Sequence, residues 1–157
     1  MAEHREHHYP VVCSWKGSTA AGYEHYSRAH DASAPPAQAS LALSSDPAFR
    51  GDPARLNPEQ LLVMAAASCQ MLSFLAIAAR KRIDVVDYED RGEGFMPEDD
   101  KPVRITRILL RPRITVKGEV DQEAMKKMIE LAHHQCFIAN SLKSDIQIQP
   151  EIVIQKA

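Results

Sequence analysis

Residues 56–81 read LNPEQLLVMAAASCQMLSFLAIAARK, and this segment decides the fold. Asn57 can accept hydrogen bonds from the free amides at the start of a helix. Pro58 suits the first helical position, because the N–H that it lacks has no partner there. Three cations follow from Arg80 onward, where the negative end of a helix dipole favours them. The pattern therefore predicts one long helix over residues 57–82.

The predicted helix is apolar on every face, with no charged side chain from Leu61 to Ala79. A surface helix of a globular protein carries one apolar stripe, whereas a helix that is apolar all round requires burial all round. The chain has 157 residues and a mass of 17.5 kDa, which is enough for a core of its own. Complete burial of so long a helix predicts, in addition, a second subunit.

The segments on either side of this helix alternate between strand and loop patterns. Before it, we expect strands at Tyr9–Trp15, Tyr23–His30 and Gln38–Leu43. Asp31–Pro36 should break any regular element, because proline lacks the ladder donor. After it, we expect a strand at Ile83–Gly94, an acidic loop at Phe95–Pro102, a strand at Val103–Lys117, a helix capped by Asp121, helical turns at His133–Leu142 and a strand at Asp145–Ile154. Pro112 should mark a bulge or an edge position.

The composition excludes several classes of protein. A net charge of −2 argues against nucleic-acid binding, which needs a basic surplus. Three cysteines, at positions 13, 69 and 136, are too few and too dispersed for a disulfide framework or a zinc module. The N-terminus MAEHREHHYP is polar, unlike a signal peptide. We expect a cytoplasmic protein with no membrane span and no nucleic-acid or membrane partner, in which residues 1–8 are disordered and residues 9–157 form a single domain.

The sequence lacks the common signatures of cofactor sites and offers few candidate metal ligands. The sequence contains no GxGxxG fingerprint and no GxSxG elbow. The histidines fall in two groups, His4, His7 and His8 near the N-terminus, and His133 and His134 next to Cys136. Adjacent residues of a helix point about 100° apart, so at most one of the second pair can join Cys136 at a metal. We expect neither a metal site nor a cofactor.

The thiols allow two interpretations. Cys69 lies in the apolar helix and can be a small buried hydrophobe, the usual environment of a free cysteine. Alternatively, the small residues before it leave room for a reactant, and Cys136 at a helix end can come beside it and exchange a disulfide with it. A buried thiolate then needs a cation, and arginine is suitable because it is always charged and can be held by an acid. Cys13 is expected to be structural.

The sequence also resembles a known family. LNPEQLLVMAAASCQMLSFLAIAARK, AHHQCFIANSLKSDI and a closing IQP strand resemble the OsmC/Ohr family of thiol-dependent hydroperoxide reductases. The similarity extends through YEHYSRAH, LSSDPAFRGDP and ILLRPRITV, in the same order along the chain. CFIANS stands where Ohr proteins read CPxS, so the chain is more similar to the OsmC-like branch.

The resemblance implies an α+β fold with two antiparallel sheet regions around long central helices, built as an intertwined homodimer with active sites at the subunit interface. It implies that Cys69 is the peroxidatic nucleophile and Cys136 the resolving thiol. Glu59 would orient an arginine near the thiolate, and that arginine is Arg28 or, alternatively, Arg50. Gln70 follows the nucleophile where many OsmC-like relatives carry His, and its role stays open.

In the reaction that the resemblance implies, the Cys69 thiolate attacks a peroxide oxygen and becomes a sulfenic acid. Cys136 condenses with it to a disulfide, and an external dithiol reduces the disulfide. The substrate class is organic hydroperoxides, with hydrogen peroxide reduced less well. Two alternatives stay open: a dimeric binding module for a small hydrophobic ligand with incidental thiols, and a metal site at His133, His134 and Cys136.

Overall fold

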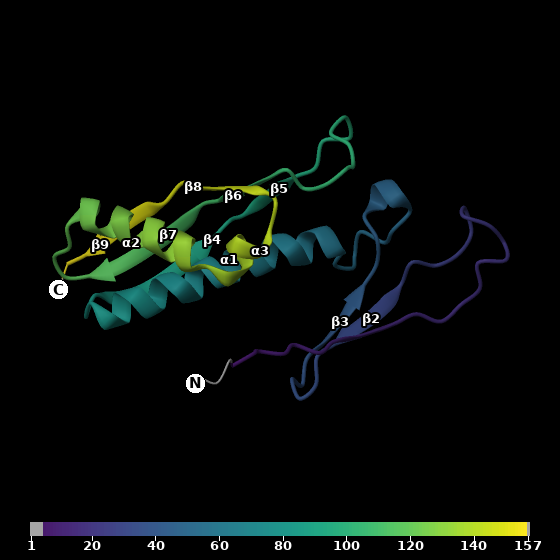
Figure 1. The fold of residues 1–157 in the computed structure, drawn as a ribbon, viewed down its shortest axis with the longest axis horizontal. Helices are drawn as coiled ribbons and strands as arrows, with labels where there is room; N and C mark the ends of the chain where they lie inside the picture. Colours follow the sequence, from purple (N-terminus) through teal and green to yellow (C-terminus); the bar gives the residue numbers. More distant parts are fainter. Residues whose placement is uncertain (1–4, 157) are drawn as a thin grey trace. The chain divides into compact units, whose positions relative to one another are not determined.

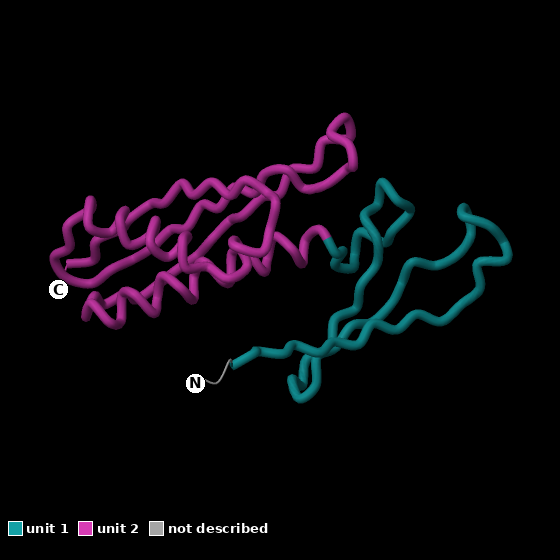
Figure 2. The backbone as a smooth tube through the Cα atoms, viewed as in Figure 1, with its two compact units in different colours: residues 1–58 teal, residues 59–157 magenta. Residues whose placement is uncertain are grey.

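The computed structural model describes residues 5–156, and the chain divides into two compact units, residues 1–58 and residues 59–157 (Figure 2). Each unit is described by itself below. The disorder predicted for residues 1–8 falls partly on residues 1–4, which lie outside the described residues. Residues 5–8 belong to no helix or strand. The single domain expected over residues 9–157 stays a prediction.

The first unit contains a three-stranded antiparallel sheet. Its elements are β1 (Val12–Ser14), β2 (His30–Ser33), β3 (Ser40–Leu43) and the short 3-10 helix η1 (Pro47–Phe49), with β2 in the middle of the sheet. The strand predicted at Tyr23–His30 is wrong, because β2 begins where that prediction ends and runs into the predicted breaker. Residues 30–33 can pair on both sides since the two prolines at positions 35 and 36 come after the last ladder residue.

The second unit begins at the second residue of α1 (Pro58–Arg80), the long helix predicted from its caps and its charge pattern (Figure 1). It starts directly after Asn57, as expected. It ends two residues earlier than predicted, before Arg82, whose φ of 58° is left-handed and cannot continue an α-helix. The prediction of the helix is confirmed, and only its C-terminal boundary differs.

Two three-stranded sheets make up the rest of the second unit, together with two helices. The strands are β4 (Asp84–Asp90), β5 (Glu93–Phe95), β6 (Arg107–Leu110), β7 (Pro112–Lys117), β8 (Asp145–Ile148) and β9 (Glu151–Gln155), in the orders β4-β7-β9 and β5-β6-β8. The helices are α2 (Gln122–Gln135) and α3 (Phe137–Ser141). Asp121 caps α2 as predicted, and its carboxylate accepts hydrogen bonds from the amides of Glu123 and Ala124.

The α+β class is confirmed, but the prediction that the sheets are antiparallel is wrong for this unit. β4 pairs with β7 and β5 with β6 antiparallel, whereas β8 pairs with β6 and β9 with β7 in parallel. The reason is the connection: α2 and α3 carry the chain from the end of β7 back to the start of β8, and such a helical crossover returns the next strand in the same direction.

Pro112 lies in a central strand and not at an edge, so that part of its prediction is wrong. It is the first residue of β7, a position where a missing ladder donor is tolerated. An irregularity in the strand is present one residue before Pro112, where the expected bulge would lie. Arg111 separates β6 from β7, and its backbone amide donates to the Asp90 carboxylate at 2.8 Å instead of to a ladder carbonyl.

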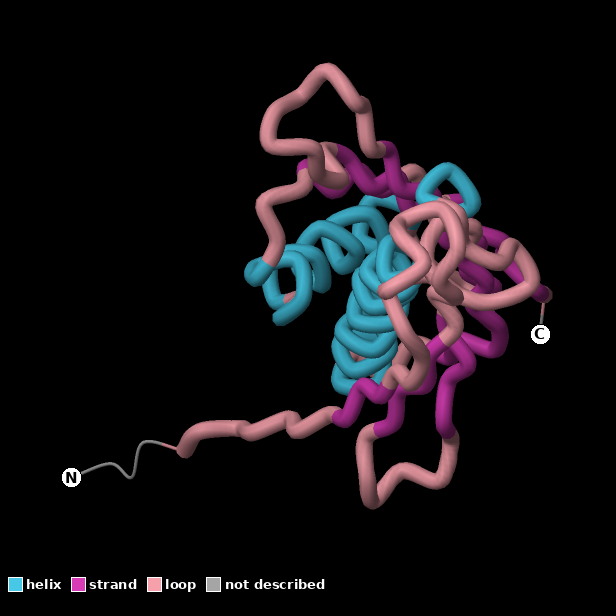
Figure 3. Tube along the Cα trace, turned by 90° about the vertical axis from the view of Figure 1, so that its right-hand side faces the viewer, coloured by secondary structure: helices cyan, strands magenta, loops and turns pink. Residues whose placement is uncertain are grey.

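The core of the second unit lies between the helices and β7. Phe74, Ile77 and Ala78 of α1 pack with Ile114 and Val116 of β7 and with one face of α2, formed by Met125, Met128, Ile129 and Ala132. Figure 3 distinguishes these helices from the strands by colour. Both helices therefore share one apolar face of the strand, and their packing positions the junction of α2 and α3.

Much of α1 remains uncovered within one chain. Its buried residues are Ala66, Gln70, Phe74, Ile77 and Ala78. Among residues 5–156, α1 is also the helix whose length and composition would allow it to cross a membrane. The uncharged stretch Leu61–Ala79, already evident in the sequence, gives α1 this length and composition. A core helix of a soluble protein passes the same test, and α1 packs on β7 and α2 as a core helix does.

Candidate active site

Two of the three cysteines lie where α1 meets the junction of α2 and α3. Cys69 is half-buried in the fourth turn of α1. Cys136 is only 1% exposed and connects the two shorter helices. Its sulfur accepts a hydrogen bond from the backbone amide of Ala139 at 3.4 Å, which caps α3. Cys13, in contrast, is exposed on β1 in the first unit.

The Cys69 and Cys136 thiols are in hydrogen-bonding contact. Burial raises the pKa of the Cys69 thiol, but hydrogen bonds outweigh it and leave that pKa below its ordinary value. The backbone of Ile138, the Cys136 thiol and the backbone of Phe137 supply these bonds, and the Ser73 hydroxyl adds another. Because these donors favour the charged form, Cys69 is the thiol of the pair that ionises first.

Cys136 shifts in the opposite direction. Burial and the neighbouring Cys69 raise its pKa to about 11, although the amide of Ala139 lowers it in part. Cys136 therefore stays protonated at neutral pH and can donate to the Cys69 thiolate. A reactive thiolate next to a protonated thiol is the arrangement that dithiol–disulfide chemistry requires.

Cys69 opens into a groove of about 610 Å³. The groove is lined by one stripe of α1 and by the residues around α3, namely Cys69, Leu72, Ser73, Ala76, Arg80, Gln135, Phe137 and Asn140. Leu72 and Phe137 are unusually exposed for apolar side chains, at 60% and 79%. A groove with apolar walls and a nucleophilic sulfur can hold an apolar reactant against that sulfur.

Glu59 and Cys69 do not meet within one chain. Glu59 is half-buried in the first turn of α1, and ten residues of helix at 1.5 Å each separate it from Cys69 by about 15 Å along the axis. In the described part of the second unit, no arginine forms an ion pair with Glu59. The role predicted for Glu59 therefore needs an arginine from outside the second unit of the same chain.

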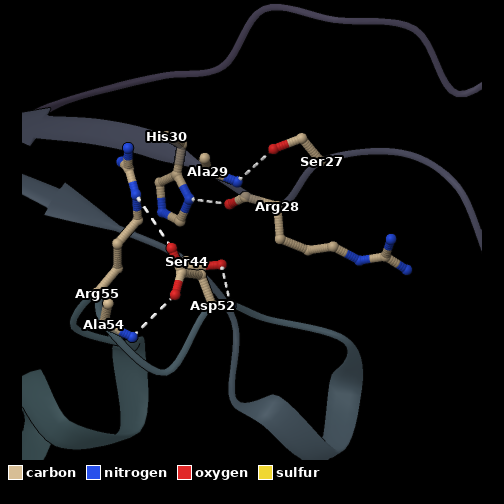
Figure 4. A network of polar contacts seen from close by, with 8 residues as sticks. All are labelled: Ser27, Arg28, Ala29, His30, Ser44, Asp52, Ala54 and Arg55. Carbon is tan, nitrogen blue, oxygen red and sulfur yellow. Dashed lines mark hydrogen bonds and ion pairs between the residues drawn. The ribbon is translucent and has the colours of Figure 1, made fainter.

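Arg28 lies in the first unit, in a cavity of about 320 Å³ whose walls include Trp15, Tyr26 and His30. Its guanidinium stacks on the Tyr26 ring at 3.7 Å from the ring centroid and donates to the backbone carbonyls of Tyr23 and Tyr26. Figure 4 shows its side chain pointing away from Ser44 and Asp52, while its own carbonyl contacts the Nδ1 of His30 at 2.8 Å. The guanidinium is thus held in one orientation by its own loop.

The other candidate arginine, Arg50, is engaged differently. It forms an ion pair with Glu24 in the first unit and has a left-handed backbone conformation, with φ 65°, at the end of η1. Arg28 stacks on aromatic rings and carries no acidic partner among the described residues, so its charge is the less neutralised of the two. The choice between them as the active-site arginine stays a prediction.

Residues 5–156 contain no group of three or more His, Cys, Asp or Glu side chains that could hold a metal ion. His133 and His134 have ring centroids 6.1 Å apart, and Cys136 turns into the contact with Cys69. His4 of the N-terminal group lies outside the described residues.

Comparison with known proteins identifies the family. Residues 51–151 match the profile of the family described as OsmC-like protein, which is more than half of the chain. The chain belongs to the OsmC-like family. An OsmC-like protein of unknown function from Vibrio cholerae is similar in structure, with a TM-score of 0.84 and 29% identity over 92% of this chain and 99% of that one.

More distant similarities extend the comparison. The uncharacterized protein YmaD of Bacillus subtilis is 22% identical over 63% of this chain and 68% of its own length. An organic hydroperoxide resistance protein from Elizabethkingia anophelis has a TM-score of 0.69 at 12% identity, over 97% of this chain and 99% of that one. At such low identity the similarity establishes the shared fold.

One residue of this OsmC-like site, Ser73, and the backbone roles of Ile138 and Phe137 were missed from the sequence. Ile138 and Phe137 act through backbone amides, which no side-chain pattern reveals. Ser73 could have been found, because residues four apart on a helix share a face and Ser73 follows Cys69 by four. Gln70, whose role was left open, is 1% exposed, and its amide donates to the carbonyl of Ile129 in α2 at 3.2 Å.

Proposed function

We propose that this protein is a thiol-dependent peroxidase that reduces organic hydroperoxides. The observation that carries the proposal is the contact between two thiols with opposite pKa shifts, lowered for Cys69 and raised for Cys136. Membership of the OsmC-like family, in which a similarly folded protein is named for organic hydroperoxide resistance, supports the same reaction class.

The reaction proceeds in three steps. The Cys69 thiolate attacks the terminal oxygen of the hydroperoxide, the S–O bond forms as the O–O bond breaks, and the alkoxide leaves and takes a proton to become an alcohol. The Cys136 thiol then attacks the sulfenic sulfur, which expels water and forms the Cys69–Cys136 disulfide. An external dithiol reduces this disulfide by exchange and is itself oxidised. No metal or organic cofactor takes part.

The walls of the groove favour organic hydroperoxides over hydrogen peroxide. Leu72, Ala76 and Phe137 can contact an alkyl or aryl group, and each buried CH₂ of such a group contributes about 0.8 kcal/mol of transfer free energy. Hydrogen peroxide has no apolar group to bury. We expect the reaction in the cytoplasm, where thiols are kept reduced.

The working unit is a homodimer with its active sites at the subunit interface. Two features of the single chain support this: the exposed apolar surface of α1, and the separation of about 15 Å between Glu59 and Cys69 along the same helix. A second copy would cover that surface, and it would bring Arg28 and Glu59 to the thiolate. In this arrangement Arg28 stabilises the Cys69 thiolate and Glu59 orients Arg28.

The test uses the reduced protein, cumene hydroperoxide and intact-mass measurement. We expect each chain to lose about 2 Da, with the change mapped to a Cys69–Cys136 disulfide, and a dithiol to restore the mass. In a Cys136→Ser variant, Cys69 should instead gain oxygen and proceed to the sulfinic acid, a gain of about 32 Da. A Cys69→Ser variant that consumes peroxide as fast as the unaltered protein would refute the proposal.

The groove also supports a second candidate function. Its apolar walls and its volume of about 610 Å³ suit a small hydrophobic ligand, with thiols that take no part. The same experiment separates the two functions: a binding module keeps its mass unchanged under mild oxidation, and a bound apolar probe would protect Cys69 from alkylation.

A further inference from the structure

The hydroxyl of Ser73 lies one helical turn beyond the nucleophile, on the same stripe of α1. Residues four apart on a helix are neighbours, and both Cys69 and Ser73 line the groove that would hold the substrate. Ser73 is half-buried, and its hydroxyl is hydrogen-bonded to the Cys69 thiol. It is the side-chain donor to that thiol from α1 itself.

Within residues 5–156, the Ser73 hydroxyl does not make the hydrogen bond that is common for a serine within a helix. A helical serine ordinarily donates to the backbone carbonyl four residues earlier. Ser141 in α3 does so, donating to the carbonyl of Phe137 at 2.8 Å. Among the described residues, Ser73 makes no such bond to a carbonyl, and its hydroxyl is one of the groups that lower the pKa of the neighbouring Cys69 thiol.

Two other sets of donors surround the thiol. The backbone amides of Ile138 and Phe137 and the Cys136 thiol approach Cys69 from the start of α3 and its junction with α2. Cys136 is the titratable group that faces Cys69, and Arg80 is the charged residue that lines the groove. The two amides and Cys136 belong to the segment where α2 meets α3. Ser73 lies on α1 and lines the groove through which a hydroperoxide would reach the sulfur.

We propose that Ser73 is a catalytic residue of this site, whose hydroxyl holds the Cys69 thiolate and then donates a hydrogen bond to the oxygen that leaves the peroxide. This inference rests on the proposed peroxidase function. As the S–O bond forms and the O–O bond breaks, the electron pair of the O–O bond passes to the departing alkoxide oxygen. Ser73 stabilises this charge until solvent supplies the proton, in the manner of an oxyanion-hole donor.

The experiment compares two reactions of the same thiolate in Ser73→Ala. Iodoacetamide releases iodide, which needs no hydrogen-bond donor, whereas cumene hydroperoxide releases an alkoxide, which does. Rates at Cys69 are followed by peptide mass, because Cys13 is also exposed, over a pH series that stays below the range in which Cys136 ionises.

In Ser73→Ala, the rise of the Cys69 alkylation rate with pH should move to higher pH. The rate at the upper end of the series should reach the same plateau as in the unaltered protein. At that plateau the peroxide rate should fall by about tenfold or more, because one donor to a developing oxyanion is lost. Ser73→Thr keeps the hydroxyl and should restore most of the rate. Ser68→Ala, at the residue directly before Cys69 and outside the groove, is the matched control and should behave like the unaltered protein.

The outcomes separate this inference from the proposed function. Equal plateau rates with peroxide in Ser73→Ala and the unaltered protein would overturn the role of Ser73 and leave the peroxidase intact. An equal fractional loss in alkylation and in peroxide reduction would also overturn it, since that pattern indicates a disturbed site. If the unaltered protein does not react with peroxide at Cys69, both proposals fail together.

Discussion

Replacing Gln70 with Met tests the energetic effect of the buried carboxamide beside the nucleophile. Gln70 is 1% exposed between α1 and α2, and its Oε1 atom is buried without a hydrogen-bond partner. Its Nε2 atom donates to the carbonyl of Ile129 at 3.2 Å. That carbonyl lies inside α2 and keeps its helical hydrogen bond when the side chain is changed.

The magnitude follows from these two atoms. An unsatisfied buried acceptor costs about 1–3 kcal/mol, and a neutral hydrogen bond contributes roughly 0.5–1.5 kcal/mol net. Met has a similar length and flexibility and adapts to irregular space. Gln70→Met should therefore raise the free energy of unfolding by about 1 kcal/mol. For a chain of 157 residues this corresponds to an increase in Tm of roughly 2–4 °C.

The assay is thermal and denaturant unfolding at one protein concentration, because subunit association would make Tm depend on concentration. Gln70→Ala is the matched control. It removes the same polar atoms but leaves a cavity, and should lower the free energy of unfolding by roughly 2 kcal/mol or more. A loss of more than about 1 kcal/mol in Gln70→Met would refute the reasoning, since it would show that Oε1 has a hydrogen-bond partner in the folded protein.

Two further predictions concern the thiol pair and the cap of α2. The Cys136 thiol donates to Cys69, so Cys136→Ala should raise the pKa of Cys69. Alkylation of Cys69 at pH 7 should then slow by about fivefold, the equivalent of roughly 1 kcal/mol. Cys136→Ser keeps a donor and should change the rate less. The rate should rise with pH in both variants, as the thiolate forms, and an unchanged profile in Cys136→Ala would contradict the contact. Asp121→Ala removes two hydrogen bonds at the start of α2 and should cost about 1 kcal/mol in unfolding experiments, while Asp121→Asn should keep most of the stability; equal losses in both would exclude a capping role.

The long helix and its caps could be predicted because they depend on local sequence. Asn57, Pro58 and Arg80 act within one turn of a helix end, and the absence of charge between them is visible without a structure. The cap of α2 at Asp121 was predictable for the same reason. Candidate nucleophiles could also be named, since cysteines are few and the motifs around them resemble a known family.

Strand positions and directions depended on the tertiary structure. The segment at Tyr23–His30 has strand composition, yet β2 forms at His30–Ser33, where both neighbouring strands can pair with it. The parallel pairing of β8 and β9 follows from the crossover through α2 and α3. Such pairings join residues far apart in the chain, and alternation of side chains does not encode the direction of the neighbouring strand.

By itself, the sequence determined that one uncharged helix carries Cys69 and that a second thiol, Cys136, follows at the end of another helix. Only the tertiary structure decided that the two sulfurs meet, that Cys69 is the more acidic thiol and that Ser73 shares its groove. The reason is physical: a helix is stabilised by contacts among near neighbours, whereas the pKa of a thiol depends on burial and on donors brought to it by folding, here the backbone amides of Ile138 and Phe137.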